Sequence, residues 1–200
     1  MTMKPMSFDF KSRRSMVLAR RGMVAASNPL ASQAGLDVLR RGGNAADAAI
    51  AAAAVMNVTA PASTGVGGDC FALYYDAKTG AISALNGSGR APAALTIDLL
   101  AQQGISGSIP PRSPHAVTVP GAVMGWHDLL ARHGTMSLAD VLADAIHYAE
   151  DGYAVSPVFG ASWQRAESLL REGAHTEEYL PNGAPPQVGQ VVRLPGLAAT

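Results

Sequence analysis

The most constraining feature of this sequence is an alanine-rich stretch, Ala45–Val58, whose only charged residue is Asp47. Alanine favours the helix and lets neighbouring elements approach closely, so this stretch is expected to form a helix deep in a core. It is too short to cross a bilayer, which takes about 20 apolar residues. Asn44 can cap the helix, and Asp47 can support its positively polarised start. Because a buried carboxylate is costly unless it is paired or capping, we interpret Asp47 as a capping residue.

The remaining elements are predicted from apolar periodicity and from turn residues. The expected strands are 22–27, 70–75, 81–85 and 115–119, with a hairpin turn at 76–80. The expected helices are 30–41, 96–103, 122–133, 138–150 and 159–171, with a further helix beginning at 195. The stretch 179–194 is expected to be irregular because it holds three prolines and two glycines.

Composition narrows the function classes. Hydrophobic residues make up 48% of the chain and charged residues 15%, which is enough apolar material for a sizeable core. The 15 Lys and Arg residues balance 15 Asp and Glu residues. A neutral chain without a basic block gives no reason to expect nucleic acid or an anionic membrane surface as a partner. A small molecule or another protein is the expected partner.

Cysteine and histidine give no sign of a metal, a cofactor or a disulfide. Cys70 is the single cysteine, so no disulfide can form within the chain and no CxxC metal site exists. We interpret it as a small buried hydrophobe, since a catalytic cysteine needs a paired histidine and none is near it in sequence. The five histidines lack the spacing of metal ligands and are interpreted as surface or core residues: His115, His127, His133, His147 and His175.

Two glycine-rich segments are the candidate binding elements. Gly65-Val-Gly-Gly-Asp-Cys70 is not a dinucleotide fingerprint, because a helix precedes it, a strand follows it and the third glycine is missing. It predicts a close approach of backbone, either to a substrate or to a neighbouring strand. Asn86-Gly-Ser-Gly-Arg-Ala-Pro92 combines a flexible backbone with Ser88 and Arg90. Arg90 can clamp a substrate carboxylate or, alternatively, hold two loops through their carbonyls.

The N-terminus is expected to be a polar extension over 1–21. It carries six Lys and Arg residues and no apolar run of the length that a secretion signal requires. The protein is therefore expected to be cytoplasmic.

Several segments, in register, resemble the γ-glutamyltransferase (γ-glutamyltranspeptidase) family. They are 23–32, 34–49 with its Arg-Arg-Gly-Gly-Asn-Ala-Ala-Asp run, 63–68, 74–80, 90–92, 119–123, 125–126, 180–183 and 191–200. Each is weak alone, but together they span 22–200 in the family's order. The resemblance implies that 22–200 is the N-terminal portion of the family's large subunit.

The resemblance implies a fold and a chemistry. The expected fold class is α+β, a four-layer αββα sandwich of N-terminal-nucleophile hydrolases that is incomplete in this chain. The family precursor cuts itself into a large and a small subunit, and the new N-terminal Thr of the small subunit attacks an amide carbonyl. That Thr is expected beyond position 200, so none of the residues of this chain is expected to be catalytic. The small subunit of the same precursor is an expected partner.

The substrate class is where this chain departs from the family pattern. In the typical transpeptidases that this chain resembles, the corresponding segment reads Arg-Glu-x-Ala-Pro. Its Arg holds the α-carboxylate of the γ-glutamyl group. Alignment on Ala91-Pro92 places Ser88 at that Arg and Gly89 at the Glu, with Arg90 two positions later. This resembles the amidohydrolases and acylases of the family, so an amide hydrolase with Ser88 and Arg90 in its substrate site is expected. A true γ-glutamyltransferase is one alternative, and a non-catalytic binding protein of this length is another.

Overall fold

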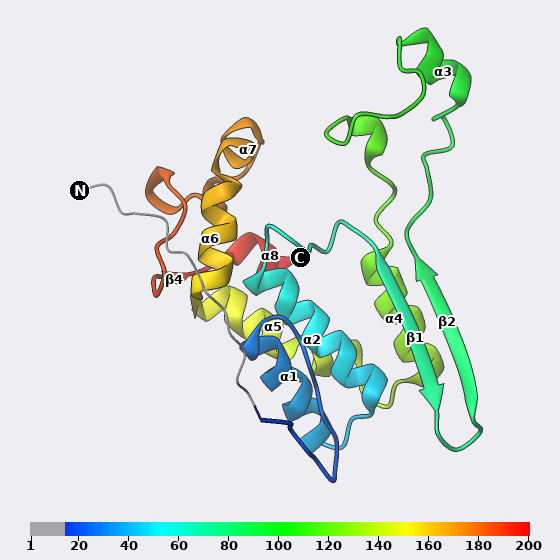
Figure 1. The fold of residues 1–200 in the computed structure, drawn as a ribbon, viewed down its shortest axis with the longest axis vertical. Coiled ribbons are helices and arrows are strands. Elements are labelled where there is room, and N and C mark those ends of the chain that lie inside the picture. The colour runs from blue at the N-terminus through cyan, green and yellow to red at the C-terminus, as the bar shows by residue number, and fades with distance from the viewer. Residues whose placement is uncertain (1–14) are drawn as a thin grey trace.

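The computed structural model describes residues 15–200 as a body of packed helices with a projecting hairpin and arm (Figure 1). The helices are α1 (Pro29–Arg40), α2 (Ala45–Thr59), α3 (Ile97–Gln102), α4 (Ala122–His133), α5 (Leu138–Asp151), α6 (Pro157–Arg165), α7 (Glu167–Glu172) and α8 (Pro195–Ala199). The strands are β1 (Cys70–Asp76), β2 (Ala81–Gly87), β3 (Tyr153–Ala154) and β4 (Val191–Val192). Single 3-10 turns lie at Pro114–Ala116, Glu177–Tyr179 and Pro181–Gly183.

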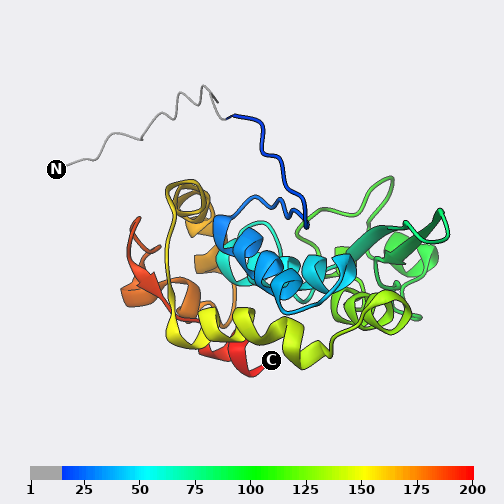
Figure 2. The ribbon, with the colours of Figure 1, turned by 90° about the horizontal axis from the view of Figure 1, so that it is seen from below.

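Helix α2 is the central element, as its composition predicts. It packs against α1, α4 and α5, and Figure 2 shows α1 and α2 lying above α5. Ile50, Ala51 and Val55 are almost fully buried on it. Small alanine side chains let three helices approach one helix at once, and the core forms around it. Among residues 15–200, no helix is both long enough and apolar enough to cross a membrane.

The predicted cap of α2 is confirmed. The Asn44 side chain accepts hydrogen bonds from the backbone N–H groups of Ala46 and Asp47. The Asp47 carboxylate accepts in return from the Asn44 N–H at 2.8 Å. This reciprocal capping box pairs amide groups that the helix itself leaves without partners.

Asp47 also makes a contact that the sequence did not predict. Its fully buried carboxylate accepts from the Thr135 hydroxyl at 2.6 Å, from the Thr135 N–H at 3.0 Å and from the Met136 N–H at 3.2 Å. Burial acts to raise the pKa of Asp47, but the hydrogen bonds from Thr135, Asn44 and Met136 outweigh it and hold that pKa below its ordinary value. The carboxylate therefore joins the start of α2 to the connection between α4 and α5.

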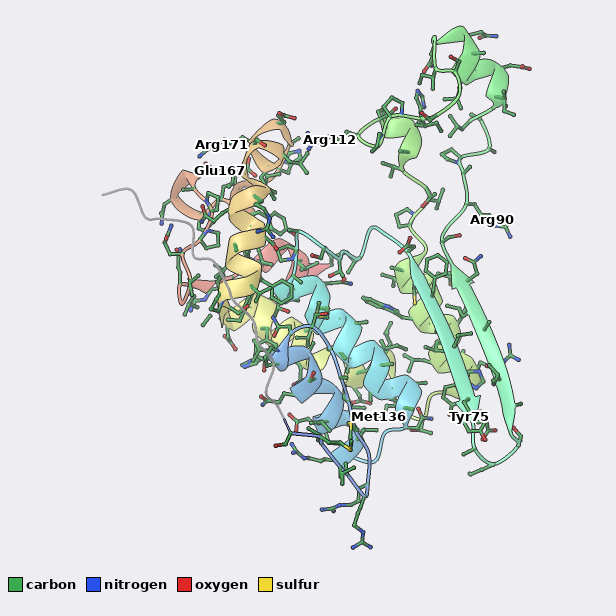
Figure 3. The ribbon with its side chains drawn as sticks, in the orientation of Figure 1. Tyr75, Arg90, Arg112, Met136, Glu167 and Arg171 are labelled. Atoms are coloured by element: carbon green, nitrogen blue, oxygen red, sulfur yellow. The ribbon has the colours of Figure 1, made fainter. Side chains whose placement is uncertain are left out.

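The predicted hairpin forms, and one of its faces is left bare. Strands β1 and β2 pair antiparallel from Cys70 opposite Gly87 to Asp76 opposite Ala81. Cys70, Ala72 and Tyr74 pack against the core beside α4. The opposite face exposes four large apolar side chains, Phe71, Leu73, Tyr75 and Ile82, each more than 60% accessible. Figure 3 shows Tyr75 on the turn half of this hairpin. A two-stranded sheet with a bare apolar face is one layer of a larger structure.

His133 fastens the hairpin to α4. Its ring stacks on Tyr74 with centroids 4.1 Å apart, and its Nε2 lies 2.8 Å from the Ser83 hydroxyl. The Asn44 amide donates to the His133 carbonyl. His133, expected from the sequence to be a surface or core residue, is half-buried and packs between the hairpin and α4. Its partners lie 50 or more residues away in the chain, so no local pattern could name them.

Two predicted strands are wrong. Residues 22–27 have no regular secondary structure and no strand partner within the described residues, and Val24 instead rests against Gly35 of α1. Residues 115–119 form part of a 3-10 turn at Pro114–Ala116, which Ser113 caps, followed by extended chain. In both cases the apolar run has the propensity of a strand but finds no adjacent edge to pair with.

The last third of the chain departs from prediction in two places. The expected helix over 159–171 is two helices, α6 and α7, separated at Ala166. The stretch expected to be irregular contains β4, which pairs antiparallel with β3. The predicted helix start at Pro195 is confirmed as α8. For the expected polar extension, residues 15–21 are exposed coil, and residues 1–14 lie outside the described part of the chain.

Tyr153 provides a test of this packing. It is 5% exposed, and its hydroxyl donates to the Val58 carbonyl at the end of α2 at 2.9 Å. We expect Tyr153→Phe to lower the free energy of unfolding by about 1 kcal/mol, because a buried carbonyl loses its donor. Denaturant unfolding measures the change. An unaltered midpoint would show that the bond contributes nothing, and Tyr75→Phe, on the exposed hairpin face, is the matched control.

Candidate functional site

Three glycine-containing segments meet where the hairpin joins α4. The loop after α2 contributes Gly68, whose carbonyl accepts from the N–H groups of Gly121 and Ala122 at 3.0 and 3.1 Å. The end of β2 contributes Gly87, and a Cβ at Gly121 would lie 2.2 Å from the Gly87 oxygen. Glycine is required where main chains pack this closely. The sequence left open whether the Gly65–Gly68 loop approaches a substrate or a neighbouring strand. In the structure, Gly68 contacts neighbouring backbone.

Ser88 and Arg90, the two predicted substrate-binding residues, lie at this junction on the segment that leaves β2. The Ser88 N–H donates to the Asn86 side chain at 3.1 Å, and its hydroxyl donates to the Gly89 carbonyl at 3.3 Å. The Arg90 carbonyl accepts from the Val119 N–H at 2.9 Å. The segment is thus held by bonds within itself and by bonds from Thr118 and Val119.

The Arg90 side chain is exposed and points away from the helical body (Figure 3). Within residues 15–200 its guanidinium makes no ion pair and no hydrogen bond, so the loops are joined by its backbone and not by its charge. An exposed guanidinium on a fixed backbone can bind a carboxylate through two parallel N–H bonds. Its role in substrate binding stays a prediction.

Cys70 borders the same junction without the properties of a nucleophile. It is half-buried at the start of β1, and a Cβ placed on Gly125 would lie 3.0 Å from its Cβ. Burial and the neighbouring Asp69 carboxylate raise the pKa of its thiol. The thiol therefore stays protonated at neutral pH, which agrees with its interpretation as a small hydrophobe.

A pocket of about 640 Å³ opens beside the glycine loop. It is lined by residues 61–65 and 67–71, by Ala53, Met56 and Asn57 of α2, and by Trp126 of α4. Its walls are mostly backbone and small side chains. Over residues 15–200, no three His, Cys, Asp or Glu side chains are grouped so that they could hold a metal ion. Neither Ser88 nor Arg90 is among the residues that line this pocket.

Comparisons with known proteins agree on one family. The sequence model described as gamma-glutamyltranspeptidase matches residues 31–200. The chain is 35% identical to a glutathione hydrolase proenzyme of Bacillus subtilis over 98% of its own length, and 39% identical to an oxamate amidohydrolase proenzyme of Klebsiella pneumoniae over 90%. It covers 34% of each of these relatives, so it spans about a third of their length.

A solved structure extends the likeness to the fold. The chain superimposes over its whole length on a cephalosporin acylase from Bacillus halodurans, with a TM-score of 0.89 and 43% identity, and covers 38% of that chain. The α+β fold class is therefore confirmed, with the mixed helices and hairpin forming part of a larger N-terminal-nucleophile hydrolase architecture.

Proposed function

Because this chain belongs to the gamma-glutamyltranspeptidase family, we propose that it is part of an amide-bond hydrolase or acyltransferase that works as an amidohydrolase or acylase. The whole protein takes an amide whose acyl group carries an anion, and it releases that acyl group to water or to an amine. The catalytic Thr belongs to a small subunit that self-cleavage of the precursor produces, and this chain contributes to the large subunit beside it.

One observation carries the choice of substrate. Ser88 stands where the family's glutamyl-binding Arg is expected, and Arg90 lies two residues further along an exposed strand exit. Gly89 between them has a φ of +77°, so Arg90 leaves the main chain in a different direction from Ser88. The segment therefore lacks the family's usual γ-glutamyl pattern, but the Arg90 guanidinium remains able to bind a carboxylate on an acyl chain.

Three chromogenic amides separate the alternatives in the mature full-length enzyme. Glutaryl-p-nitroanilide carries a terminal carboxylate, butyryl-p-nitroanilide lacks it, and γ-glutamyl-p-nitroanilide adds an α-ammonium to the glutaryl group. We expect the highest kcat/KM for the glutaryl amide. A preference of about tenfold or more for the γ-glutamyl amide would favour the second candidate, a true γ-glutamyltransferase, which the 35% identity to a glutathione hydrolase proenzyme supports.

A further inference from the structure

Residues 91–117 form an arm that leaves β2, carries α3 near its tip and returns to α4 (Figure 1). The arm closes on itself at its base. The Thr118 hydroxyl donates to the Ser88 carbonyl at 3.1 Å, and the Val119 N–H donates to the Arg90 carbonyl at 2.9 Å. We call residues 118–121 the strap, because this segment is hydrogen-bonded to Ser88 and Arg90, the residues on both sides of Gly89.

Gly89 is shaped by the strap. Its φ is +77°, in the left-handed region that side-chain-bearing residues rarely adopt. A Cβ at this position would lie 2.0 Å from the Val119 oxygen and 3.0 Å from the Thr118 hydroxyl. The contact with Val119 cannot be relieved by rotating a side chain, since that oxygen belongs to the main chain. Any residue other than glycine must therefore push the strap away or change the path of the backbone into Arg90.

The strap itself is anchored at its other end. Gly121 packs against the Gly87 oxygen and the Gly89 nitrogen, and its N–H donates to Gly68. Ser88, Gly89 and Arg90 thus lie between two fixed points, β2 before them and the strap beside them. The direction in which Arg90 leaves the main chain follows from this packing and not from contacts of its own side chain.

We propose that Gly89 and Thr118 are positioning residues that determine where the Arg90 guanidinium is presented, and so which anionic acyl groups the enzyme accepts. The inference rests on the proposed function, in which Arg90 binds the substrate carboxylate. Thr118 holds the Ser88 carbonyl, and Gly89 supplies the turn that directs Arg90. A substrate without a carboxylate does not engage Arg90, so its binding is independent of both residues.

The test uses Gly89→Ala, Thr118→Val and Thr118→Ser in the mature full-length enzyme, with glutaryl- and butyryl-p-nitroanilide as substrates. We expect Gly89→Ala to raise KM for the glutaryl amide about tenfold, because the backbone must leave its left-handed conformation. Thr118→Val removes one hydrogen bond and is expected to raise this KM about fivefold. Thr118→Ser keeps the hydroxyl and is expected to leave this KM near that of the unaltered enzyme. KM for the butyryl amide and kcat for both substrates should change less than about twofold.

Val117→Ala is the matched control, since Val117 precedes the strap and is 61% exposed. Should Gly89→Ala fail to fold, the Thr118 pair carries the test. A rise in KM for both amides alike, or the same loss in Thr118→Ser as in Thr118→Val, would indicate a merely structural role and overturn the inference.

Arg90→Ala separates the strap inference from the proposed role of Arg90 in substrate binding. If it raises KM for the glutaryl amide while Gly89→Ala and Thr118→Val do not, the strap inference fails and the proposed clamp stands; if it changes nothing, both fail.

Discussion

Replacing Asp47 by alanine is expected to lower the free energy of unfolding by about 3 kcal/mol. Asp47 is fully buried and accepts hydrogen bonds from the N–H groups of Asn44, Thr135 and Met136 and from the Thr135 hydroxyl. Alanine leaves all of these part-buried donors without their acceptor. The change also removes half of the capping box of α2, the helix around which the core is built.

Denaturant unfolding of the full-length protein measures this loss, with Asp37→Ala as the matched control. Asp37 pairs with Arg40 on the surface of α1, where an ion pair contributes about 0–1 kcal/mol. Equal shifts for the two variants would contradict the account of Asp47, because the same residue type would then matter no more when buried than when exposed.

The pH dependence of stability follows from the same carboxylate. The pKa of Asp47 is lower in the folded chain than its ordinary value of 3.8. Its contribution is therefore fully present above about pH 4 and is lost as the pH falls through the depressed pKa. In Asp47→Asn this part of the acid sensitivity should disappear. An identical acid unfolding profile for Asp47→Asn and the unaltered protein would exclude Asp47 as its source.

Replacing Arg90 by alanine is expected to raise KM for an anionic acyl substrate about 30-fold, which corresponds to about 2 kcal/mol. The guanidinium is exposed and makes no hydrogen bond or ion pair within residues 15–200, so its removal should not disturb the fold. The loss should appear in KM and not in kcat, because the carboxylate is bound equally in the ground state and the transition state.

Steady-state kinetics with glutaryl-p-nitroanilide, together with a melting curve to exclude unfolding, checks this result. Arg90→Lys is expected to recover only part of the loss, since an ammonium cannot form the two parallel bonds of a guanidinium. Arg112→Ala is the control. Arg112 is also an exposed arginine on the arm, and it pairs at a distance with Glu172 at 4.0 Å. A similar rise in KM for both alanine variants would show a general effect of positive charge and contradict a specific clamp.

The local elements of this fold could be predicted because their signals are local. Asn44 and Asp47 cap α2 from three residues apart, and the turn at 76–80 sets the hairpin register. The failures share a cause: residues 22–27 and 115–119 have strand-like composition, but a strand exists only where a second chain segment supplies its hydrogen bonds. Composition cannot tell whether that segment is present.

The candidate site also combines local features that the sequence predicts with tertiary contacts that it does not. The sequence indicated Ser88 and Arg90 from residue type and from the family pattern, and the structure places both on the segment that leaves β2, Ser88 half-buried and Arg90 exposed. It could not indicate Thr118, which meets Ser88 from 30 residues away across the whole arm. Nor could the sequence show that Gly89 is held in a left-handed conformation beside the Val119 carbonyl. That constraint comes from tertiary packing, and the residues next to Gly89 in the sequence do not reveal it.

We expect the intact mass of the protein expressed from its native gene to show whether this chain is part of a self-processing amide hydrolase. Measured under denaturing conditions, the mature protein should separate into two fragments. The larger should contain this sequence, and the smaller should begin with Thr. A single unprocessed species in active preparations would contradict the claim, because no new N-terminal Thr would then exist to attack the amide.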